Sequence, residues 1–323
     1  MSGMVDAAQM MPLRIAASAD AAEGIRWFEL VHPDGADLPA FTPGSHLKVR
    51  VPNGAIRKYS LCNDPNERRH YVITVKREAA GQGGSISLVD SAKSGDTLPV
   101  AAPENAFPLA ATASRHIFIA GGIGITPIMS MIRSFGEAPS LPWKLHYLTR
   151  SPETTAFLGD LGAPEMRGRV DIHHDHGDPT RAFDLWPVLE RPLGGAHIYC
   201  CGPRGLMEGV RDMAGHWPSS SVHFESFDGA GAPRADDRPF KVGLARSGGS
   251  FDVPVGETIL SVLRAAGHTL ASSCESGTCG TCRTGLVEGE ADHRDMVLMP
   301  EETDAQIMIC VSRAKSDRIV VDL

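Results

Sequence analysis

The sequence lacks any apolar run of the ~18–20 residues that a membrane-spanning helix needs. The segment from Met1 to Met11 also lacks the basic flank and apolar stretch of a signal peptide. The net charge of −8 lacks the positive excess that nucleic acid or an anionic membrane would attract. We therefore expect a cytoplasmic, monomeric protein that binds neither nucleic acid nor membrane. Its seven cysteines are then ligands or free thiols rather than disulfides.

The chain of 323 residues is long enough for two or three domains, and it shows no internal repeat of roughly 20–50 residues. The part up to residue 107 contains short apolar or alternating runs separated by turn signals such as Pro-Asn-Gly. These runs predict strands of a small antiparallel barrel, and they are Ile25–Leu30, His46–Val51, Lys58–Leu61 and Tyr71–Lys76.

From residue 108 to 228 the pattern changes to alternating strands and helices, which predicts a parallel sheet with crossover helices. The predicted elements are strands at His116–Ala120, Lys144–Leu148 and His197–Cys201 and a helix at Pro127–Phe135. Residues 229–238 are small, polar and bounded by proline, which predicts a linker. The last part, 239–323, predicts a hairpin at Phe240–Val255, a helix at Thr258–Ala266, and strands at Gln306–Ser312 and Arg318–Leu323.

The strongest motif is a group of four cysteines in this last part. Cys274, Cys279 and Cys282 are separated by four and then two residues, and Cys310 follows after 27 more, which is the plant-type arrangement for a [2Fe–2S] cluster. Gly277 and other small residues between the ligands allow backbone N–H groups to point at the sulfurs. A structural zinc site is the alternative, but zinc sites usually pair two short cysteine knuckles. We place Cys310 in an apolar strand and expect Cys62 and Cys200 to pack as small hydrophobic residues.

A glycine-rich turn follows the first strand of the predicted parallel sheet. Gly121, Gly122 and Gly124 precede Thr126 and Pro127, which are a suitable N-cap and first helical residue. Such a turn can bring phosphate to a helix N-terminus, although the full dinucleotide fingerprint is absent and tight packing is the alternative. A second turn, Cys201-Gly202-Pro203, ends a later strand, and both turns would face one crevice. Arg150 follows another strand and leaves NAD or NADP undecided.

The barrel segment contains candidates for flavin contacts. Arg57 suits a phosphate, and Tyr59 suits the face of a ring. Ser85 follows two glycines and predicts a second helix cap. Simple alternation puts Tyr59 and Ser60 on opposite faces, so both can contact one flavin only if the strand ends or bends there. An ordinary amphipathic strand is the alternative interpretation.

Together and in this order, these motifs resemble those of the phthalate dioxygenase reductase family, which are class IA reductases of Rieske oxygenases in the ferredoxin–NADP reductase superfamily. The resemblance runs essentially end to end and rests on Arg57-Lys-Tyr-Ser-Leu-Cys-Asn-Asp, Gly83-Gly-Ser-Ile-Ser, Ala120-Gly-Gly-Ile-Gly-Ile-Thr-Pro, His173-His-Asp-His-Gly-Asp-Pro-Thr, Tyr199-Cys-Cys-Gly-Pro, His223-Phe-Glu-Ser-Phe and Ser273-Cys-Glu-Ser-Gly-Thr-Cys-Gly-Thr-Cys.

The resemblance implies an FMN-binding barrel (1–107), an NAD-binding α/β domain (108–228) and, after the linker, a β-grasp [2Fe–2S] ferredoxin domain (239–323). It implies FMN rather than FAD, and NADH as co-substrate. The implied FMN contacts are Arg57, Lys58, Tyr59, Ser60, Thr74, Lys76, Gly83, Gly84, Ser85, Thr126 and Phe227. The implied nucleotide site contains Gly121, Gly122, Gly124, Arg150, Cys201, Gly202 and Pro203. Ser60, Cys201 and Phe227 are the residues expected beside the reacting rings.

The implied function is an NADH-dependent reductase that passes electrons through FMN and the cluster to a Rieske-type terminal oxygenase, with phthalate dioxygenase as the expected partner. A vanillate-type O-demethylase or a phenoxybenzoate dioxygenase is the alternative partner, and a non-catalytic iron–sulfur carrier is the alternative class. From Asp252 to the end there are 12 acidic and 6 basic residues, a net of −6, which predicts docking on a more basic partner. The run His173-His174-Asp175-His176 fits a surface turn, and we expect no metal there.

Overall fold

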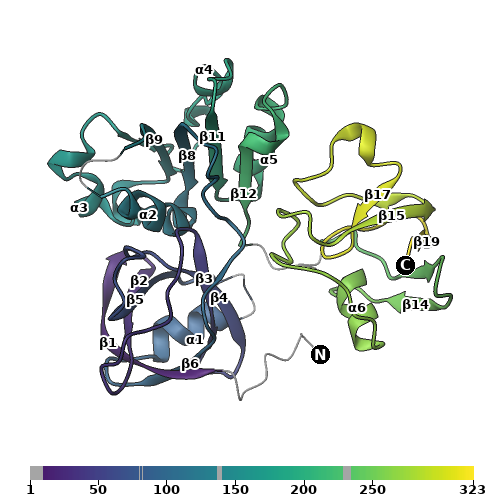
Figure 1. The fold of residues 1–323 in the computed structure, drawn as a ribbon, viewed down its shortest axis with the longest axis horizontal. Helices are drawn as coiled ribbons and strands as arrows, with labels where there is room; N and C mark the ends of the chain where they lie inside the picture. The colour runs from purple at the N-terminus through teal and green to yellow at the C-terminus, as the bar shows by residue number, and fades with distance from the viewer. Residues whose placement is uncertain (1–9, 80, 82, 137–139, 228–233) are drawn as a thin grey trace. The chain divides into compact units, whose positions relative to one another are not determined.

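The computed structural model describes residues 10–79, 81, 83–136, 140–227 and 234–323 (Figure 1). The chain divides into two compact units, one extending to His223 and one from Phe224 to Leu323. Within the described residues, no helix is long and apolar enough to cross a membrane. The predicted fold class is confirmed, because an antiparallel sheet, a parallel sheet with helices and a ferredoxin-type sheet follow one another along the chain.

The first sheet is antiparallel and has the strand order β4-β3-β6-β1-β2-β5, with β7 paired to β3. A bridge between Leu61, just after β4, and Ile73 in β5 links its two ends into a barrel. Apolar side chains such as Phe28, Leu47 and Ile73 fill its interior. The strands are β1 (Met11–Ala22), β2 (Ile25–Val31), β3 (Ser45–Arg50), β4 (Ile56–Ser60), β5 (His70–Lys76), β6 (Thr97–Val100) and β7 (Glu104–Asn105).

The four strands predicted here are present, whereas β1 was not predicted. Its second half is rich in alanine, which is a weak strand former, but the strand is held between β2 and β6 and buries Leu13 and Ile15. The helix α1 (Gly84–Ser91) buries Leu88 in the barrel core.

The second sheet has the order β10-β9-β8-β11-β12. Strands β10, β9, β8 and β11 pair in parallel, and α2 packs its apolar side chains on this sheet. The elements are β8 (Arg115–Gly121), α2 (Ile125–Ser134), β9 (Trp143–Thr149), α3 (Leu158–Leu161), β10 (Val170–His174), α4 (Trp186–Leu189), β11 (Ala196–Cys201), α5 (Arg204–Met213) and β12 (Val222–Glu225).

Two details of this part differ from the prediction. Helix α2 begins at Ile125, directly after a 3₁₀ turn at Gly122–Gly124, so the predicted start at Pro127 is two residues late. Strand β10 includes His173 and His174, which were predicted to lie in a surface turn. The turn begins only at Asp175, and His176 there has a positive φ of 54°.

The C-terminal unit contains a five-stranded sheet of order β14-β13-β19-β15-β17 and a small β16-β18 pair. Strand β13 pairs in parallel with β19 and antiparallel with β14, which confirms the predicted hairpin. Thr258 caps the predicted helix by accepting a hydrogen bond from Ser261 N–H (3.0 Å). The elements are β13 (Phe240–Leu244), β14 (Ser250–Val253), α6 (Ile259–Ala265), β15 (Arg283–Glu288), β16 (Ala291–Asp292), β17 (Gln306–Met308), β18 (Arg313–Ala314) and β19 (Arg318–Val321).

The end of the predicted linker is held against this unit by buried charges. Asp237 is 2% exposed and forms ion pairs with Arg294 and with Arg313 (3.8 Å), which are 8% and 3% exposed. Residues 229–233 of that linker lie outside the described residues. The predicted boundaries at 107, 228 and 238 stay predictions. Short 3₁₀ turns complete the chain at Pro152–Thr154, Pro164–Met166, Pro179–Arg181, Ser219–Ser221 and Pro300–Glu302.

Candidate electron-transfer sites

The four predicted cluster ligands come from two places in the C-terminal unit. Cys274, Cys279 and Cys282 lie on the loop between α6 and β15, and Cys310 lies in the turn that follows β17. The prediction of Cys310 within a strand is therefore wrong, because β17 ends at Met308, where turn hydrogen bonds to the Met308 carbonyl take over. Cys282 and Cys310 are 5% and 1% exposed, and the other two are partly exposed.

The loop directs backbone donors at its sulfur atoms, as the small residues predicted. Ser276 N–H and Thr278 N–H each donate to Cys274 Sγ (3.4 Å), and Cys274 N–H donates to Cys279 Sγ (3.5 Å). A side-chain hydrogen bond with the Cys279 thiol contributes most to lowering the pKa of Cys274, followed by hydrogen bonds from Thr278 and Ser276. These donors favour the anionic ligand form that a metal centre requires.

Positive backbone dihedrals produce this wrapping. Gly277 and Gly280 have φ of 75° and 79°, in the region that glycine occupies without steric cost. Glu275 also has a positive φ (56°), and its carboxylate accepts from Arg264 of α6 (2.7 Å) and from Ser272 (2.7 Å). Arg264 was not predicted as part of the site. The only sequence signal was a basic residue in the last turn of α6, which does not specify its partner.

The flavin candidates gather where β4, β5 and the start of α1 meet. Strand β4 ends at Ser60, as required if Tyr59 and Ser60 are to contact one ligand. The buried atoms Tyr59 Oη and Ser60 Oγ have no hydrogen-bond partner among the described residues. Burial raises the pKa of Tyr59 to about 12, against a lowering by Arg57, so the phenol stays protonated and can donate.

Arg57 lies directly over the start of α1. A methyl group on Gly84 would come within 2.7 Å of Arg57 Nε and 2.8 Å of its Cγ, so a larger residue there would displace the arginine side chain. Gly83 precedes the helix with a φ of 77°, and no side chain caps the helix. The prediction that Ser85 is the cap is wrong, because Ser85 lies inside α1 and its Oγ accepts from Glu78 N–H (3.1 Å).

The other flavin candidates occupy neighbouring positions. Thr74 is 4% exposed in β5, and Lys76 ends that strand with an ion pair to Glu78 (2.9 Å). Lys58 is exposed. An uncapped helix start beside a guanidinium, together with two buried hydroxyls lacking partners, is a donor set that fits a flavin phosphate and a polar ring edge. The residues present therefore fit FMN.

The two glycine turns of the parallel sheet are packed against each other. A methyl group on Gly124 would lie 2.1 Å from the Cys201 carbonyl oxygen, and one on Gly121 would lie 2.6 Å from Pro203 Cδ. Close packing of the two turns therefore explains the glycines at 121 and 124. Gly122 instead has open space around its Cα and a φ of 51°. Both turns lie at the carboxyl ends of β8 and β11, the edge where open α/β sheets bind ligands.

Thr126 does not cap α2 as predicted, since it lies in the first turn, is 2% exposed, and donates from Oγ1 to the Ile123 carbonyl (3.0 Å). Cys62 and Cys200 are fully buried, as expected for small hydrophobic residues. Burial raises the pKa of Cys62 to about 11 and also raises the pKa of Cys200. Arg150 is exposed, and its carbonyl accepts from His176 N–H (2.8 Å). Phe227 is 45% exposed and belongs to the C-terminal unit.

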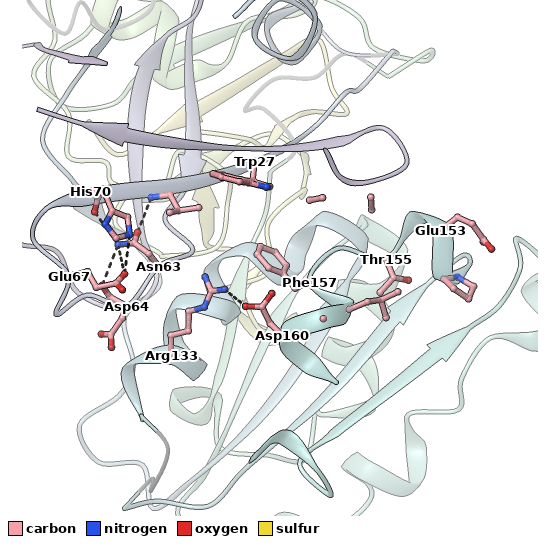
Figure 2. Close-up of a pocket in the computed structure, with 16 residues that line it drawn as sticks. Trp27, Asn63, Asp64, Glu67, His70, Arg133, Glu153, Thr155, Phe157 and Asp160 are labelled. Carbon is pink, nitrogen blue, oxygen red and sulfur yellow. Dashed lines mark hydrogen bonds and ion pairs between the residues drawn. The ribbon is translucent and has the colours of Figure 1, made fainter. Parts of the chain in front are cut away.

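A separate pocket of about 750 Å³ lies in the N-terminal unit, between barrel residues and the segment 152–160 (Figure 2). None of the predicted flavin or nucleotide residues described by the structure lines it. Arg133 crosses it, donating to the Cys62 carbonyl (2.6 Å), pairing with Asp160 (2.5 Å) and lying over the Phe157 ring. These contacts join α2 to the barrel, which is a structural role.

Comparison with known proteins identifies the chain. Residues 242–315 match the 2Fe-2S iron-sulfur cluster binding domain, which confirms the cluster and rejects zinc. The phthalate 4,5-dioxygenase oxygenase reductase subunit of Pseudomonas putida is 56% identical over 96% of both chains. Phthalate dioxygenase reductase of Burkholderia cepacia is 54% identical over 96% of this chain and 97% of its own.

The solved structure of a phthalate dioxygenase reductase, described as a modular structure for electron transfer from pyridine nucleotides to [2Fe-2S], covers 97% of this chain and 98% of its own length. It is 54% identical, with a TM-score of 0.73. The prediction of an oxidoreductase that serves an oxygenase is confirmed by these relatives. The chain therefore belongs to the phthalate dioxygenase reductase family.

Proposed function

We propose that this protein takes electrons from NADH and passes them through FMN and its [2Fe–2S] cluster to the Rieske-type oxygenase that attacks phthalate. The observation that carries the proposal is the donor set in the barrel: two buried hydroxyls without partners beside an uncapped helix start and a guanidinium. A chain that carried only the cluster would have no use for it. The relatives that share 54–56% identity work with phthalate oxygenases, which favours phthalate over vanillate or phenoxybenzoate.

The proposed division of labour follows the predicted domains. Residues 1–107 hold FMN, residues 108–228 hold NADH and residues 239–323 hold the cluster, with 229–238 as the connection. Bound FMN supplies the conversion of a two-electron hydride into single electrons. Arg57 and the start of α1 hold the flavin phosphate, while Tyr59 and Ser60 donate hydrogen bonds to the ring.

Ser60 acts by positioning, because hydride transfer needs no strong acid or base. Ser60 is 4% exposed, and its Oγ holds the ring in place in a site that excludes water. The turn at Gly121–Gly124 approaches the nucleotide, and Cys201 lies beside the nicotinamide. Phe227 stays a predicted flavin contact. Lys58, Thr74, Lys76, Gly83, Ser85 and Thr126 complete the flavin contacts, and Arg150, Gly202 and Pro203 complete the nucleotide contacts.

We propose that the acidic docking surface lies on the segment 301–304. Most acids of the C-terminal unit are paired within it, for example Glu288 with Arg318 and Asp322 with Arg246. Glu301 and Asp304 are exposed and have no ion pair among the described residues. Their neighbour Glu302 pairs with Arg283 (2.6 Å), the residue after Cys282, so the acidic segment is fastened next to a cluster ligand. We propose that the oxygenase docks there. We also propose that the protein is cytoplasmic and monomeric and that it binds no nucleic acid.

Reconstitution tests the electron path. Wild-type protein should reduce its cluster with NADH and support phthalate turnover by a phthalate oxygenase, but not comparable turnover by a vanillate or phenoxybenzoate oxygenase. Cys310→Ser should lose the cluster yet keep NADH-driven flavin bleaching, because ligand and flavin belong to different units. If wild-type protein with intact cluster neither binds flavin nor oxidises NADH, the carrier interpretation replaces this proposal.

Charge reversal tests the docking segment. Glu301→Lys with Asp304→Lys should lower the rate of oxygenase reduction, most strongly at low salt, and leave NADH oxidation unchanged. Asp236→Lys with Asp317→Lys is the charge-matched control, since Asp236 and Asp317 are also exposed and form no ion pair among the described residues. Equal losses in the two variants, or a wild-type rate that is insensitive to salt, would contradict this location.

A further inference from the structure

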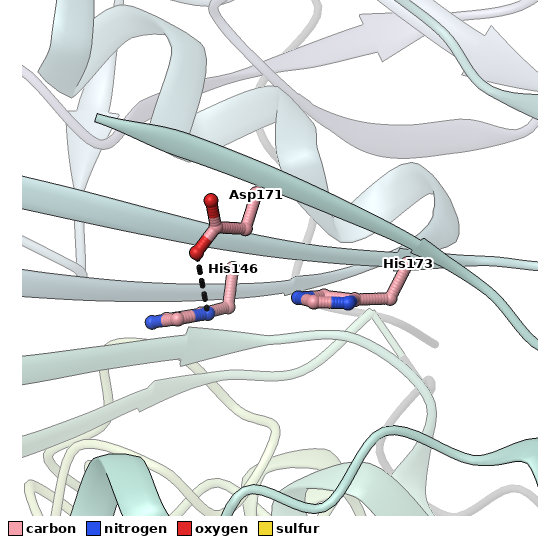
Figure 3. A group of neighbouring side chains, drawn as sticks. All are labelled: His146, Asp171 and His173. Carbon is pink, nitrogen blue, oxygen red and sulfur yellow. Dashed lines mark ion pairs between the residues drawn. The ribbon is translucent and has the colours of Figure 1, made fainter. Parts of the chain in front are cut away.

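Three potential metal ligands lie together on the parallel sheet, outside the flavin and nucleotide candidates. His146 is in β9 and Asp171 is in β10, directly opposite it in the parallel register. His173 follows two residues later in β10 and therefore has its side chain on the same face. One donor atom from each lies within 4.8 Å of the other two (Figure 3). The sequence placed His173 in a different group, with His174, Asp175 and His176.

The two imidazoles contain buried nitrogen atoms without partners. His146 Nδ1 and His173 Nε2 are both inaccessible and form no hydrogen bond within the described part of the chain. The His146 side chain is 9% exposed, and its Nδ1 lies 3.8 Å from Asp171 Oδ2, which is too far for a hydrogen bond. Native proteins rarely leave such atoms unsatisfied, so each one calls for an explanation.

The surroundings hold the rings in place without using these nitrogens. The Phe183 ring stacks on His173 (3.6 Å between centroids) and lies 5.6 Å from that of His146. The two residues after His173 have other hydrogen-bond partners. His174 Nδ1 is hydrogen-bonded to Thr149 Oγ1 (2.8 Å), and the Asp175 carboxylate accepts from Gly177 N–H (2.8 Å).

We propose that His146, Asp171 and His173 form a binding site for a divalent transition-metal ion, with Zn²⁺ the best match. Two neutral imidazoles and one carboxylate are a common zinc ligand set, and such three-ligand sites leave a fourth position for water. Ligands of a tetrahedral zinc lie roughly 3.3 Å apart for bonds of about 2.0 Å. The donor atoms need to approach one another by at most about 1.5 Å from separations within 4.8 Å, and all three come from two paired strands.

Lys144 competes with the metal for Asp171. Its Nζ lies 2.9 Å from Asp171 Oδ2 and also donates to the Gly168 carbonyl (3.2 Å). The lysine side chain is 34% exposed on a flexible stem, so the ammonium can move into solvent when a cation arrives. This arrangement makes an unusual prediction: removal of a positive residue that is not a ligand should strengthen metal binding.

The test uses the full-length protein with its cluster loaded, dialysed against ZnCl₂ in a zinc buffer, with zinc and iron counted per chain by mass spectrometry. Wild-type protein should bind one zinc beyond its iron complement. His173→Gln and Asp171→Asn should weaken zinc binding by roughly tenfold or more, and Lys144→Met should tighten it by roughly tenfold. His32→Gln, in the barrel, is the matched control and should bind zinc as wild type does.

Several outcomes would overturn the site. Wild-type protein that binds no zinc above the buffer background does so directly. Zinc bound equally by His173→Gln places the metal elsewhere, for instance on thiols freed by iron loss, which the iron count reports. If His173→Gln misfolds because its stacking on Phe183 is lost, Lys144→Met decides the question, since unchanged or weaker zinc binding in that variant contradicts the proposed competition.

Discussion

Replacement of Gly277 by alanine should destabilise the C-terminal unit and lower the amount of cluster that the protein retains. Gly277 has a φ of 75°, and a non-glycine residue in that region costs about 1–2 kcal/mol. The added methyl group would also lie 2.7 Å from Val311 Cγ2 and 3.1 Å from the Asp295 Cα. Valine is stiff and the second atom is backbone, so overpacking adds about 1–3 kcal/mol.

The total cost, about 2–5 kcal/mol, is comparable to the entire stability of a small domain. Two controls separate its parts. Gly280→Ala has the same strain (φ 79°) but approaches only Val297 Cγ1, at 3.4 Å. Gly256→Ala, in the turn before α6, has a φ of 85° and open space around the new methyl group. Each control should cost only the strain, about 1–2 kcal/mol.

The assay is urea unfolding followed by cluster absorbance, together with the iron content of each purified variant. Gly277→Ala should show the lowest midpoint and substoichiometric iron, while NADH-driven flavin bleaching continues because the flavin belongs to the other unit. If Gly277→Ala retains its iron and unfolds at the same urea concentration as Gly256→Ala, the close packing of Gly277 has no energetic consequence and the reasoning fails.

Two further predictions concern buried charge. Asp237→Asn removes the buried anion that Arg294 and Arg313 share and leaves Arg294 paired only with Asp292, so it should destabilise the C-terminal unit by at most about 3–5 kcal/mol. Asp322→Asn, at an exposed pair with Arg246, should cost about 1 kcal/mol or less, and similar urea midpoints would refute the distinction. In the N-terminal unit, burial lowers the pKa of His116 and of His223 to about 4. The unfolded chain therefore binds more protons below pH 6.5, so stability should fall as the pH drops from about 6.5 to about 4. A urea midpoint that is flat over this range, or equally steep in His116→Gln, would contradict it.

The predictions from sequence succeeded where a local pattern determines the outcome. Spacing and small residues specified the cysteine loop, and the N–H donors to Cys274 Sγ follow from that composition. Helix caps were predicted less well. Thr126 and Ser85 both have suitable side chains, but α2 is entered through a 3₁₀ turn and α1 through the left-handed Gly83, so each helix starts before its expected cap. The backbone before a helix, rather than the capping residue alone, fixed these starts.

Features that depend on register could not be predicted from one segment. His146 and Asp171 are 25 positions apart, and they become neighbours only because β9 and β10 pair in parallel with one particular alignment. A shift of one residue would move Asp171 to the opposite face and separate the three donors. Apolar contacts of Leu145 and Tyr147 on the opposite face of β9 fix that alignment, and both are fully buried. The core on one face of the sheet thus determines the polar group on the other, so core substitutions that let β10 slip should abolish zinc binding without touching a ligand.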